Sequence, residues 1–138
     1  MTPEPDQPRY PTASAKGRVD RFAGDAWFEQ LVVADEPSRL RMNAVHFAPG
    51  ARTAWHSHAV GQTLYVTEGV ALTQERGGPV LTVHPGQAVV CRPAVEHWHG
   101  AHPDHLMTHL SIWEAPEPGS DLAESTWLEH VTPDEAGA

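Results

Sequence analysis

The most informative stretch of this chain is Gly50-Ala51-Arg52-Thr53-Ala54-Trp55-His56-Ser57-His58-Ala59-Val60-Gly61-Gln62, and Gly69 follows seven residues later. In a β-strand, residues i and i+2 point to the same face, so His56 and His58 are predicted to project side by side. A tight turn over 59–61 then brings Gln62 back alongside them. Two imidazoles and an amide oxygen converge, which is a donor set for a metal ion.

A second histidine cluster, His97-Trp98-His99-Gly100, shows the same alternation. His97 completes the donor set from another strand, so the predicted ligands are His56, His58, Gln62 and His97. Imidazole together with oxygen suits a divalent transition metal. His99 shares a strand face with His97 and is therefore predicted to point into the same cavity.

A further histidine, His109, lies in a strand pattern that is apolar on both faces. One face carries Met107, His109, Ser111 and Trp113, and the other carries Leu106, Thr108, Leu110 and Ile112. A histidine buried in such a strand needs a hydrogen-bond partner or a chemical role. We expect His109 to line the metal cavity, and a structural hydrogen bond is the alternative.

Size and composition limit the classes of protein that fit. The chain has 138 residues, the usual size of one domain, with a net charge of −9 and only nine Lys and Arg, which argues against nucleic-acid binding. Cys91 is the only cysteine, so no intrachain disulfide forms, which fits a reducing compartment. Neither a signal peptide nor a transmembrane run is recognisable, and the expectation is a cytoplasmic protein without membrane contact.

Short alternating runs separated by turn residues dominate the chain after a proline-rich start. We expect an N-terminal tail over 1–18, disordered or loosely draped, a barrel over 19–132 and a C-terminal tail over 133–138. The predicted strands are 27–33, 40–47, 53–58, 63–68, 71–76, 80–83, 88–92 and 106–113, with 127–131 as a last strand or a docking segment. Turn signals every 8–12 residues are typical of an all-β sandwich or barrel.

The two histidine clusters resemble the two sequence motifs of the cupin superfamily, small β-barrels with a metal in the mouth. The first motif, G-x5-H-x-H-x3,4-E-x6-G, reads here Gly50, His56, His58, Gln62 and Gly69. The second, G-x5-P-x-G-x2-H-x3-N, starts at Gly86 and places His97 at the histidine. Four residues depart from the motifs, namely Gln62 for glutamate, Arg92 for proline, Ala94 for glycine and Ala101 for asparagine. The resemblance implies a single-domain cupin, a double-stranded β-helix or jelly-roll barrel.

A narrower resemblance is to the bacterial manganese-dependent cupin hydroxynitrile lyases. It is carried by the strings at 49–58, 61–64, 96–101, 107–110 and 127–132, and the similarity runs from about Ala26 to Glu135. That family also has glutamine as the fourth ligand. The resemblance implies the ligand set named above, with manganese as the metal, and supporting or catalytic roles for His99 and His109. Iron, nickel and zinc are the alternative metals.

Glutamine in place of glutamate changes the charge of the site. Three neutral imidazoles and a neutral amide leave a divalent ion its full +2 charge, which strengthens a Lewis acid. The charge therefore favours polarising a substrate oxygen over activating dioxygen, and the resemblance implies a lyase that cleaves or forms cyanohydrins such as mandelonitrile. His109 is the expected base and His99 the proton partner or cyanide orienter, although the two roles could be exchanged. Strand parity predicts an apolar substrate pocket from Val45, Leu64, Val66, Met107 and Trp113.

Two other functions fit the same barrel. One is a non-haem dioxygenase or oxidase that uses iron on a small organic substrate, and the other is a non-enzymatic cupin that binds a small ligand. In all three cases the expected partner is a small molecule. Because single cupin domains usually pair through their strands, the chain is expected to form a homodimer or homotetramer.

Overall fold

The computed structural model describes residues 7–136, and the parts of the two predicted tails at 1–6 and 137–138 lie outside them. Within that range the chain is all β, as predicted, and contains no helix. The strands are β1 (Ala15–Lys16), β2 (Phe22–Ala23), β3 (Ala26–Val33), β4 (Leu40–Phe47), β5 (Arg52–Thr53), β6 (His56–His58), β7 (Gln62–Gly69), β8 (Ala71–Glu75), β9 (Leu81–Val83), β10 (Ala88–Cys91), β11 (His97–Ala101), β12 (Met107–Glu114) and β13 (Ser125–Trp127).

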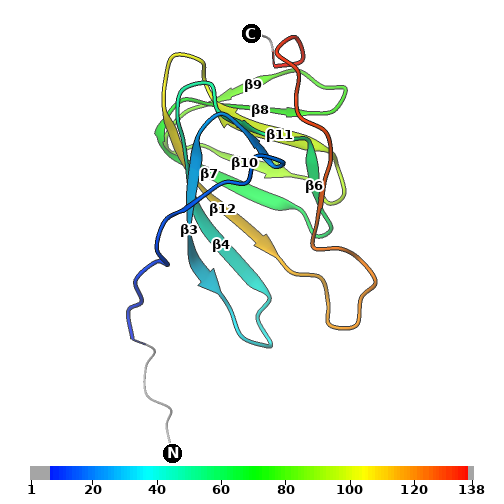
Figure 1. Cartoon of the computed structure of the whole chain (residues 1–138). Coiled ribbons are helices and arrows are strands. Elements are labelled where there is room, and N and C mark those ends of the chain that lie inside the picture. The colour runs from blue at the N-terminus through cyan, green and yellow to red at the C-terminus, as the bar shows by residue number, and fades with distance from the viewer. Residues whose placement is uncertain (1–6, 137–138) are drawn as a thin grey trace, which may run out of the picture.

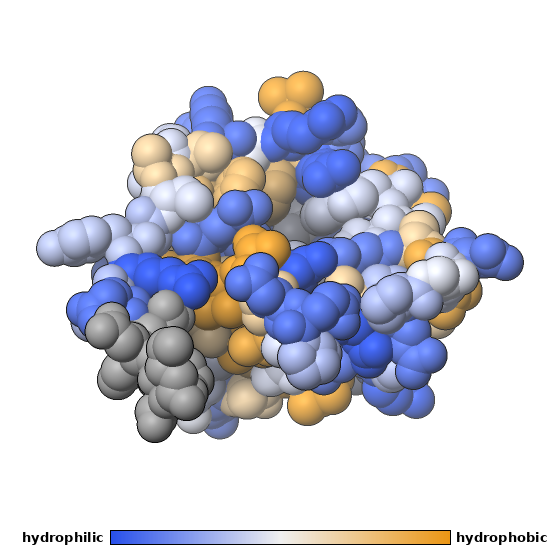
Figure 2. Space-filling view, turned by 90° about the horizontal axis from the view of Figure 1, so that it is seen from below, coloured by the Kyte–Doolittle hydropathy of each residue, from blue (hydrophilic) through white to orange (hydrophobic). Residues whose placement is uncertain are grey.

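Two antiparallel sheets form the barrel (Figure 1). The first has the order β1-β3-β4-β12-β7-β10 and the second the order β13-β6-β11-β5-β2, with β8 paired to β11 and β9. Strands far apart in sequence become neighbours in this way, since β6, β11 and β13 lie next to one another. Figure 2 shows the face turned downward in Figure 1, where hydrophobic side chains are visible between hydrophilic ones.

The turn between β6 and β7 has the predicted form and depends on Gly61. The N–H of Gly61 donates to the carbonyl of His58 at 3.1 Å, and Gly61 has a φ of +83°, which glycine adopts without strain. A Cβ at this position would lie 2.9 Å from the carbonyl oxygen of Cys91. The turn therefore returns the chain directly into β7, whose first residue is Gln62.

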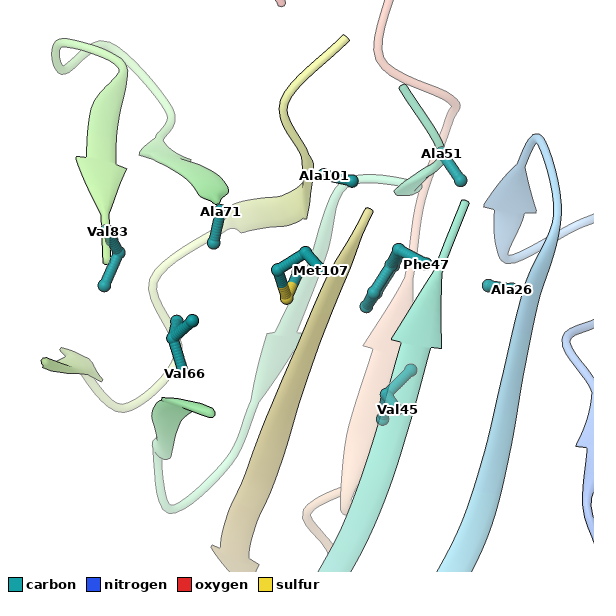
Figure 3. Close-up of a cluster of buried hydrophobic side chains, with 9 residues drawn as sticks. All are labelled: Ala26, Val45, Phe47, Ala51, Val66, Ala71, Val83, Ala101 and Met107. Atoms are coloured by element: carbon teal, nitrogen blue, oxygen red, sulfur yellow. The ribbon is translucent and has the colours of Figure 1, made fainter. Parts of the chain in front are cut away.

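The main hydrophobic core lies between the sheets (Figure 3). Its members are Ala26, Val45, Phe47, Ala51, Val66, Ala71, Val83, Ala101 and Met107. Phe47 joins this core to the histidines, because its ring centroid is 5.3 Å from that of His109 and 6.1 Å from that of His99. The histidine-bearing strands are thus packed against a solid apolar layer.

Both ends of the described chain pack onto the barrel. Residues 15 and 16, which fall in the predicted N-terminal tail, pair with β3, and the N–H of Gln30 donates to the hydroxyl of Thr12 at 2.9 Å. The C-terminal segment pairs with β6 through β13 and then buries Val131 in a second cluster with Trp55 and Trp98. No apolar helix long enough to span a bilayer occurs in residues 7–136.

Candidate metal centre and its cavity

The two histidine pairs meet because β6 and β11 are antiparallel neighbours with His97 opposite His56. The ring centroids of these two residues are 4.4 Å apart, and both side chains are buried. His58 and His99 follow two residues later on their respective strands and face the same interior, as the alternation predicted. Trp127 of β13 pairs with His56 and stacks on its ring at 4.4 Å.

The rings of His56 and His97 are each held by a nearby backbone carbonyl. The Nδ1–H of His56 donates to the oxygen of Ala54 at 2.8 Å, and that of His97 donates to the oxygen of Val95 at 3.1 Å. A carbonyl can only accept, so Nδ1 carries the proton in both rings. The Nε2 atoms consequently offer lone pairs, which is the form in which histidine binds a metal.

The ring of His58 is held by a side chain and not by a backbone carbonyl, but its Nε2 is likewise left with a free lone pair. Its Nδ1 lies 3.0 Å from the hydroxyl oxygen of Ser125, which can accept the Nδ1–H. Its Nε2 is buried and has no hydrogen-bond partner among the described residues. An unpaired buried polar atom costs about 1–3 kcal/mol, so this nitrogen fits a metal ligand better than a purely structural group.

Gln62 completes the predicted set. Its side-chain N–H donates to the hydroxyl of Ser111, which turns the amide oxygen Oε1 toward the histidines. That oxygen lies 3.1 Å from the Nε2 of His97. Because the Nδ1 of His97 carries the proton, two acceptor atoms face each other, and a shared cation would satisfy both. The structure brings the four predicted donors together, and their chemistry fits a divalent metal.

A second combination of donors overlaps with the first. Nitrogen atoms of His56, His97 and His99 lie within 4.8 Å of one another, which also forms a group that could hold a metal ion. His99 differs from His58 in its support, since its Nδ1 lies 2.9 Å from the Nε2 of His109. Both combinations contain His56 and His97. They differ in the third histidine, which is His58 in the first combination and His99 in the second.

Burial keeps these histidines neutral. It lowers the pKa of His56 well below its usual value, with neighbouring His97 and His58 adding to the effect, and it also lowers the pKa of His97. Burial, followed by the charge of His97, lowers the pKa of His58 to about 4. It likewise lowers the pKa of His109 to about 4 and takes that of His99 well below its usual value. All five rings are therefore unprotonated at neutral pH, the form that a metal site requires.

A cavity of about 530 Å³ opens onto this cluster. His56, His58, Gln62 and His99 form part of its lining, together with Val45 and Trp113 from the predicted substrate pocket. The remaining lining residues are Lys16, Arg18, Arg21, Phe22, Phe28, Gln30, Asn43, Thr53, Ser111, Glu124, Ser125 and Trp127. The cavity thus joins the candidate metal centre to a mixed wall that contains the aromatic rings of Phe22, Phe28, Trp113 and Trp127 beside polar and charged side chains.

Three predicted pocket residues do not line this cavity. Leu64 and Val66 border a small internal void together with His99 and His109, and Met107 is part of the main core. All three face inward, as their alternation predicted, but they lie deeper in the barrel. Strand parity specifies the side of a strand and not the depth along it. For the same reason His109 lies behind His99 and is absent from the cavity lining.

Several lining residues were not singled out from the sequence. Phe22 comes from the short strand β2, and Ser125 and Trp127 come from the short strand β13 near the end of the chain. None of them belongs to a local pattern that points to a site. Ser111 was the exception, because it shares a strand face with His109, and its bond to Gln62 explains why that position is polar.

Comparison with known proteins places the fold and site in a family. A family model described as the cupin domain matches residues 43–113. The chain therefore belongs to the cupin family. It is 46% identical over 120 residues to a protein named (R)-mandelonitrile lyase from Granulicella tundricola, covering 87% of this chain and 88% of that protein.

Solved structures agree with this assignment. A cupin-like protein from Thermotoga maritima is 38% identical and superposes with a TM-score of 0.81, covering 95% of both chains. A cupin 2 conserved barrel domain protein from Rhodopseudomonas palustris is 16% identical, with a TM-score of 0.68 over 89% of this chain and 79% of that one. The second likeness shows the fold alone.

Proposed function

We propose that this cupin is a metal-dependent hydroxynitrile lyase, which reversibly cleaves a cyanohydrin to an aldehyde and HCN. The observation that carries the proposal is a buried set of uncharged donors at a cavity whose lining includes four Phe and Trp rings, with the imidazole pair of His99 and His109 beside it. The 46% identity to a protein named (R)-mandelonitrile lyase supports the same reaction class.

His56, His58, Gln62 and His97 would hold the ion, and manganese is the metal we propose. A bound divalent ion supplies Lewis-acid stabilisation of negative charge on a substrate oxygen. The donors contribute no negative charge of their own. The buried Nε2 of His58 has no hydrogen-bond partner among the described residues, which favours His58 as the third imidazole, whereas the Nδ1 of His99 contacts a second titratable ring, which suits proton transfer.

His99 and His109 form the proposed proton-transfer pair. Cleavage removes the hydroxyl proton, breaks the carbon–carbon bond and releases cyanide with the electron pair, so cyanide needs a proton. His99 lines the cavity and can exchange that proton with the substrate, whereas His109 lies behind it and orients its ring through the 2.9 Å bond. Because His109 lies deeper than His99, the alternative assignment is favoured, in which His99 and not His109 is the acid–base group. Because burial lowers its pKa, protonated His99 would be a ready donor to cyanide.

The walls of the cavity suit an aromatic aldehyde. Phe22, Phe28, Val45, Trp113 and Trp127 supply apolar surface, and the volume of about 530 Å³ is in the usual range for small-ligand sites. Benzaldehyde is the simplest substrate with this character. The aromatic rings would orient it and exclude water from the reacting carbon.

A cyanohydrin assay tests the proposal directly. Benzaldehyde and cyanide are mixed at mildly acid pH with metal-loaded protein, and the rate and enantiomeric excess of mandelonitrile are measured. We expect enantioenriched product above the background rate, and loss of most of this rate in His99→Ala with the metal retained. The matched control is His84→Ala, which changes an exposed histidine outside the cavity lining. Racemic product at the background rate would rule out the lyase.

The homo-oligomer and the cytoplasmic location expected from the sequence stay predictions. The first sheet ends at β1 and β10, and two large apolar side chains near the β10 edge, Val90 and Tyr65, are exposed at 69% and 41%. Light scattering coupled to size exclusion measures the mass. A mass of two or four chains agrees with the expectation, and a single-chain mass contradicts it.

A further inference from the structure

A guanidinium group lies one aromatic ring away from the histidine cluster. Arg21, just before β2, lines the cavity and places its guanidinium carbon 5.1 Å from the ring centroid of Trp127. Trp127 in turn stacks on His56 at 4.4 Å. Arg21, Trp127 and His56 therefore form a layered arrangement in the cavity lining that ends at the candidate metal centre.

Among the cations that line the cavity, Arg21 is the one that forms no ion pair within 4.0 Å in residues 7–136, although the neighbouring Asp20 carboxylate, which pairs with Arg18, still interacts with it electrostatically. Lys16 pairs with Asp25 at 3.1 Å, and Arg18 donates two hydrogen bonds of 3.0 Å to Asp20. The ion pairs of the described residues do not include Arg21. Its side chain is partly buried, and its planar group keeps donors available to a ligand.

The single carboxylate of the lining is engaged elsewhere. Glu124 accepts the indole N–H of Trp113 at 2.8 Å and lies 3.6 Å from the guanidinium of Arg41. A divalent ion held by neutral donors would add a charge of +2 to that of Arg21 in this cavity, although the whole chain carries −9. Such a cavity attracts an anion.

We propose that Arg21 binds a carboxylate group of the substrate, so that the site prefers small aldehydes and cyanohydrins that carry an acid group over uncharged ones. The inference rests on the proposed function, because it assigns a substrate class to the same cavity. A guanidinium and a carboxylate can form two parallel hydrogen bonds, and the Trp127 face holds the guanidinium in place. The aryl or alkyl body of the substrate would lie against the aromatic wall.

The proposed preference for an acid group is tested by a binding experiment without cyanide. Because no turnover occurs under these conditions, the dissociation constants are measured directly. Metal-loaded protein is titrated by calorimetry with 4-formylbenzoate and with its methyl ester, which has the same ring and aldehyde but no charge. We expect the acid to bind at least about tenfold more tightly than the ester, the size of a charge-assisted contact. Equal dissociation constants would overturn the proposal.

Variants of Arg21 locate the effect. Arg21→Gln should bring the ratio of the two dissociation constants close to one, and Arg21→Lys should keep part of the preference because it retains a point charge. The control is Arg39→Gln. Arg39 pairs with Glu114 and Glu117 and does not line the cavity, so this variant should keep the wild-type ratio of dissociation constants. A preference that persists in Arg21→Gln would mean that another cation holds the acid, and would overturn the assignment.

Failure here and failure of the lyase are distinguishable. If benzaldehyde is converted enantioselectively but acid and ester bind equally, the substrate class is wrong and the lyase stands. If no cyanohydrin forms while the acid preference depends on Arg21, the anion site stands and the reaction is wrong.

Discussion

The two His-x-His segments look alike in sequence but are supported in different ways. The first histidine of each pair, His56 or His97, donates from Nδ1 to the carbonyl two residues before it. The second histidine of each pair depends on a distant side chain, since His58 meets Ser125 from the C-terminal strand and His99 meets His109 from β12. The first positions are thus fixed by local backbone and the second by tertiary packing.

This difference separates two roles within one cluster. A hydroxyl beside Nδ1 leaves His58 with an unpaired Nε2 that suits a metal. An imidazole beside Nδ1 couples His99 to a second titratable ring, which suits proton transfer. We therefore propose that the same spacing on two strands supplies a ligand in one case and an acid–base group in the other.

The largest effect is expected from the locally fixed pair. His56→Ala and His97→Ala each remove a donor that belongs to both possible ligand combinations, and we expect metal affinity to fall by more than about 100-fold, beyond the loss typical of supporting residues. Competition titration with a chromogenic chelator measures this. Metal affinity within tenfold of the wild type in either variant would contradict the assignment.

The two second-position histidines should differ from each other. His58→Ala is expected to lose metal to a similar extent, whereas His99→Ala should retain metal and lose most of the lyase rate. Elemental analysis and the cyanohydrin assay on the same preparations separate the two outcomes. If His58→Ala instead retains the metal and His99→Ala loses it, the ion is bound by His56, His97 and His99.

A smaller effect is expected when only the support of a ligand is removed. Ser125→Ala takes away the oxygen beside Nδ1 of His58 and should weaken metal binding by about 10- to 100-fold. Ser120→Ala, in the exposed loop before β13, is the matched control and should bind as the wild type does. Equal affinities for the two variants would show that the hydroxyl does not position the ring.

Metal binding should persist in mild acid. With ordinary pKa values near 6.5, proton competition at three histidines would weaken binding by about 1,000-fold at pH 5.5. Burial lowers the pKa of all three ligand histidines, that of His58 to about 4, so proton competition at pH 5.5 is expected to be much weaker than for ordinary histidines. Chelator titrations at pH 7.5, 6.5 and 5.5 should differ by less than about tenfold. A loss near 1,000-fold would contradict the lowered pKa values.

The smallest effect concerns a turn that supports the His58 strand. Ala94 has a φ of +61° and donates its N–H to the carbonyl of His58 at 2.9 Å. This conformation costs a residue with a Cβ about 1–2 kcal/mol, and glycine avoids that cost. Glycine also makes the unfolded chain more flexible, which offsets part of the stabilisation. Ala94→Gly should therefore raise the free energy of unfolding by about 0.5–1 kcal/mol in urea denaturation.

The control for that substitution is Ala59→Gly, in a turn where alanine has an ordinary negative φ. It should leave the free energy of unfolding unchanged or lower it. If Ala94→Gly does not stabilise the protein relative to Ala59→Gly, the positive φ at Ala94 is not a source of strain.

Much of this arrangement could be predicted because it depends on short-range rules. Alternation gave the inward faces of β6, β7, β11 and β12, and Gly61 gave the turn that returns Gln62. The depth of Leu64 and Met107 could not be predicted, since period-2 patterns carry no information along the barrel axis. The Ser125 contact and the Arg21–Trp127 stack join segments more than 60 residues apart, and no local pattern encodes them.

The most direct test of the proposed centre is the metal content of the wild-type protein purified without chelators. Three neutral imidazoles and a neutral amide oxygen should retain a divalent transition metal, so we predict one ion per chain by elemental analysis. We also predict that dialysis against a chelator removes it and that one equivalent of manganese restores it. Correctly folded protein that contains no metal and takes up none in such a titration would contradict the account.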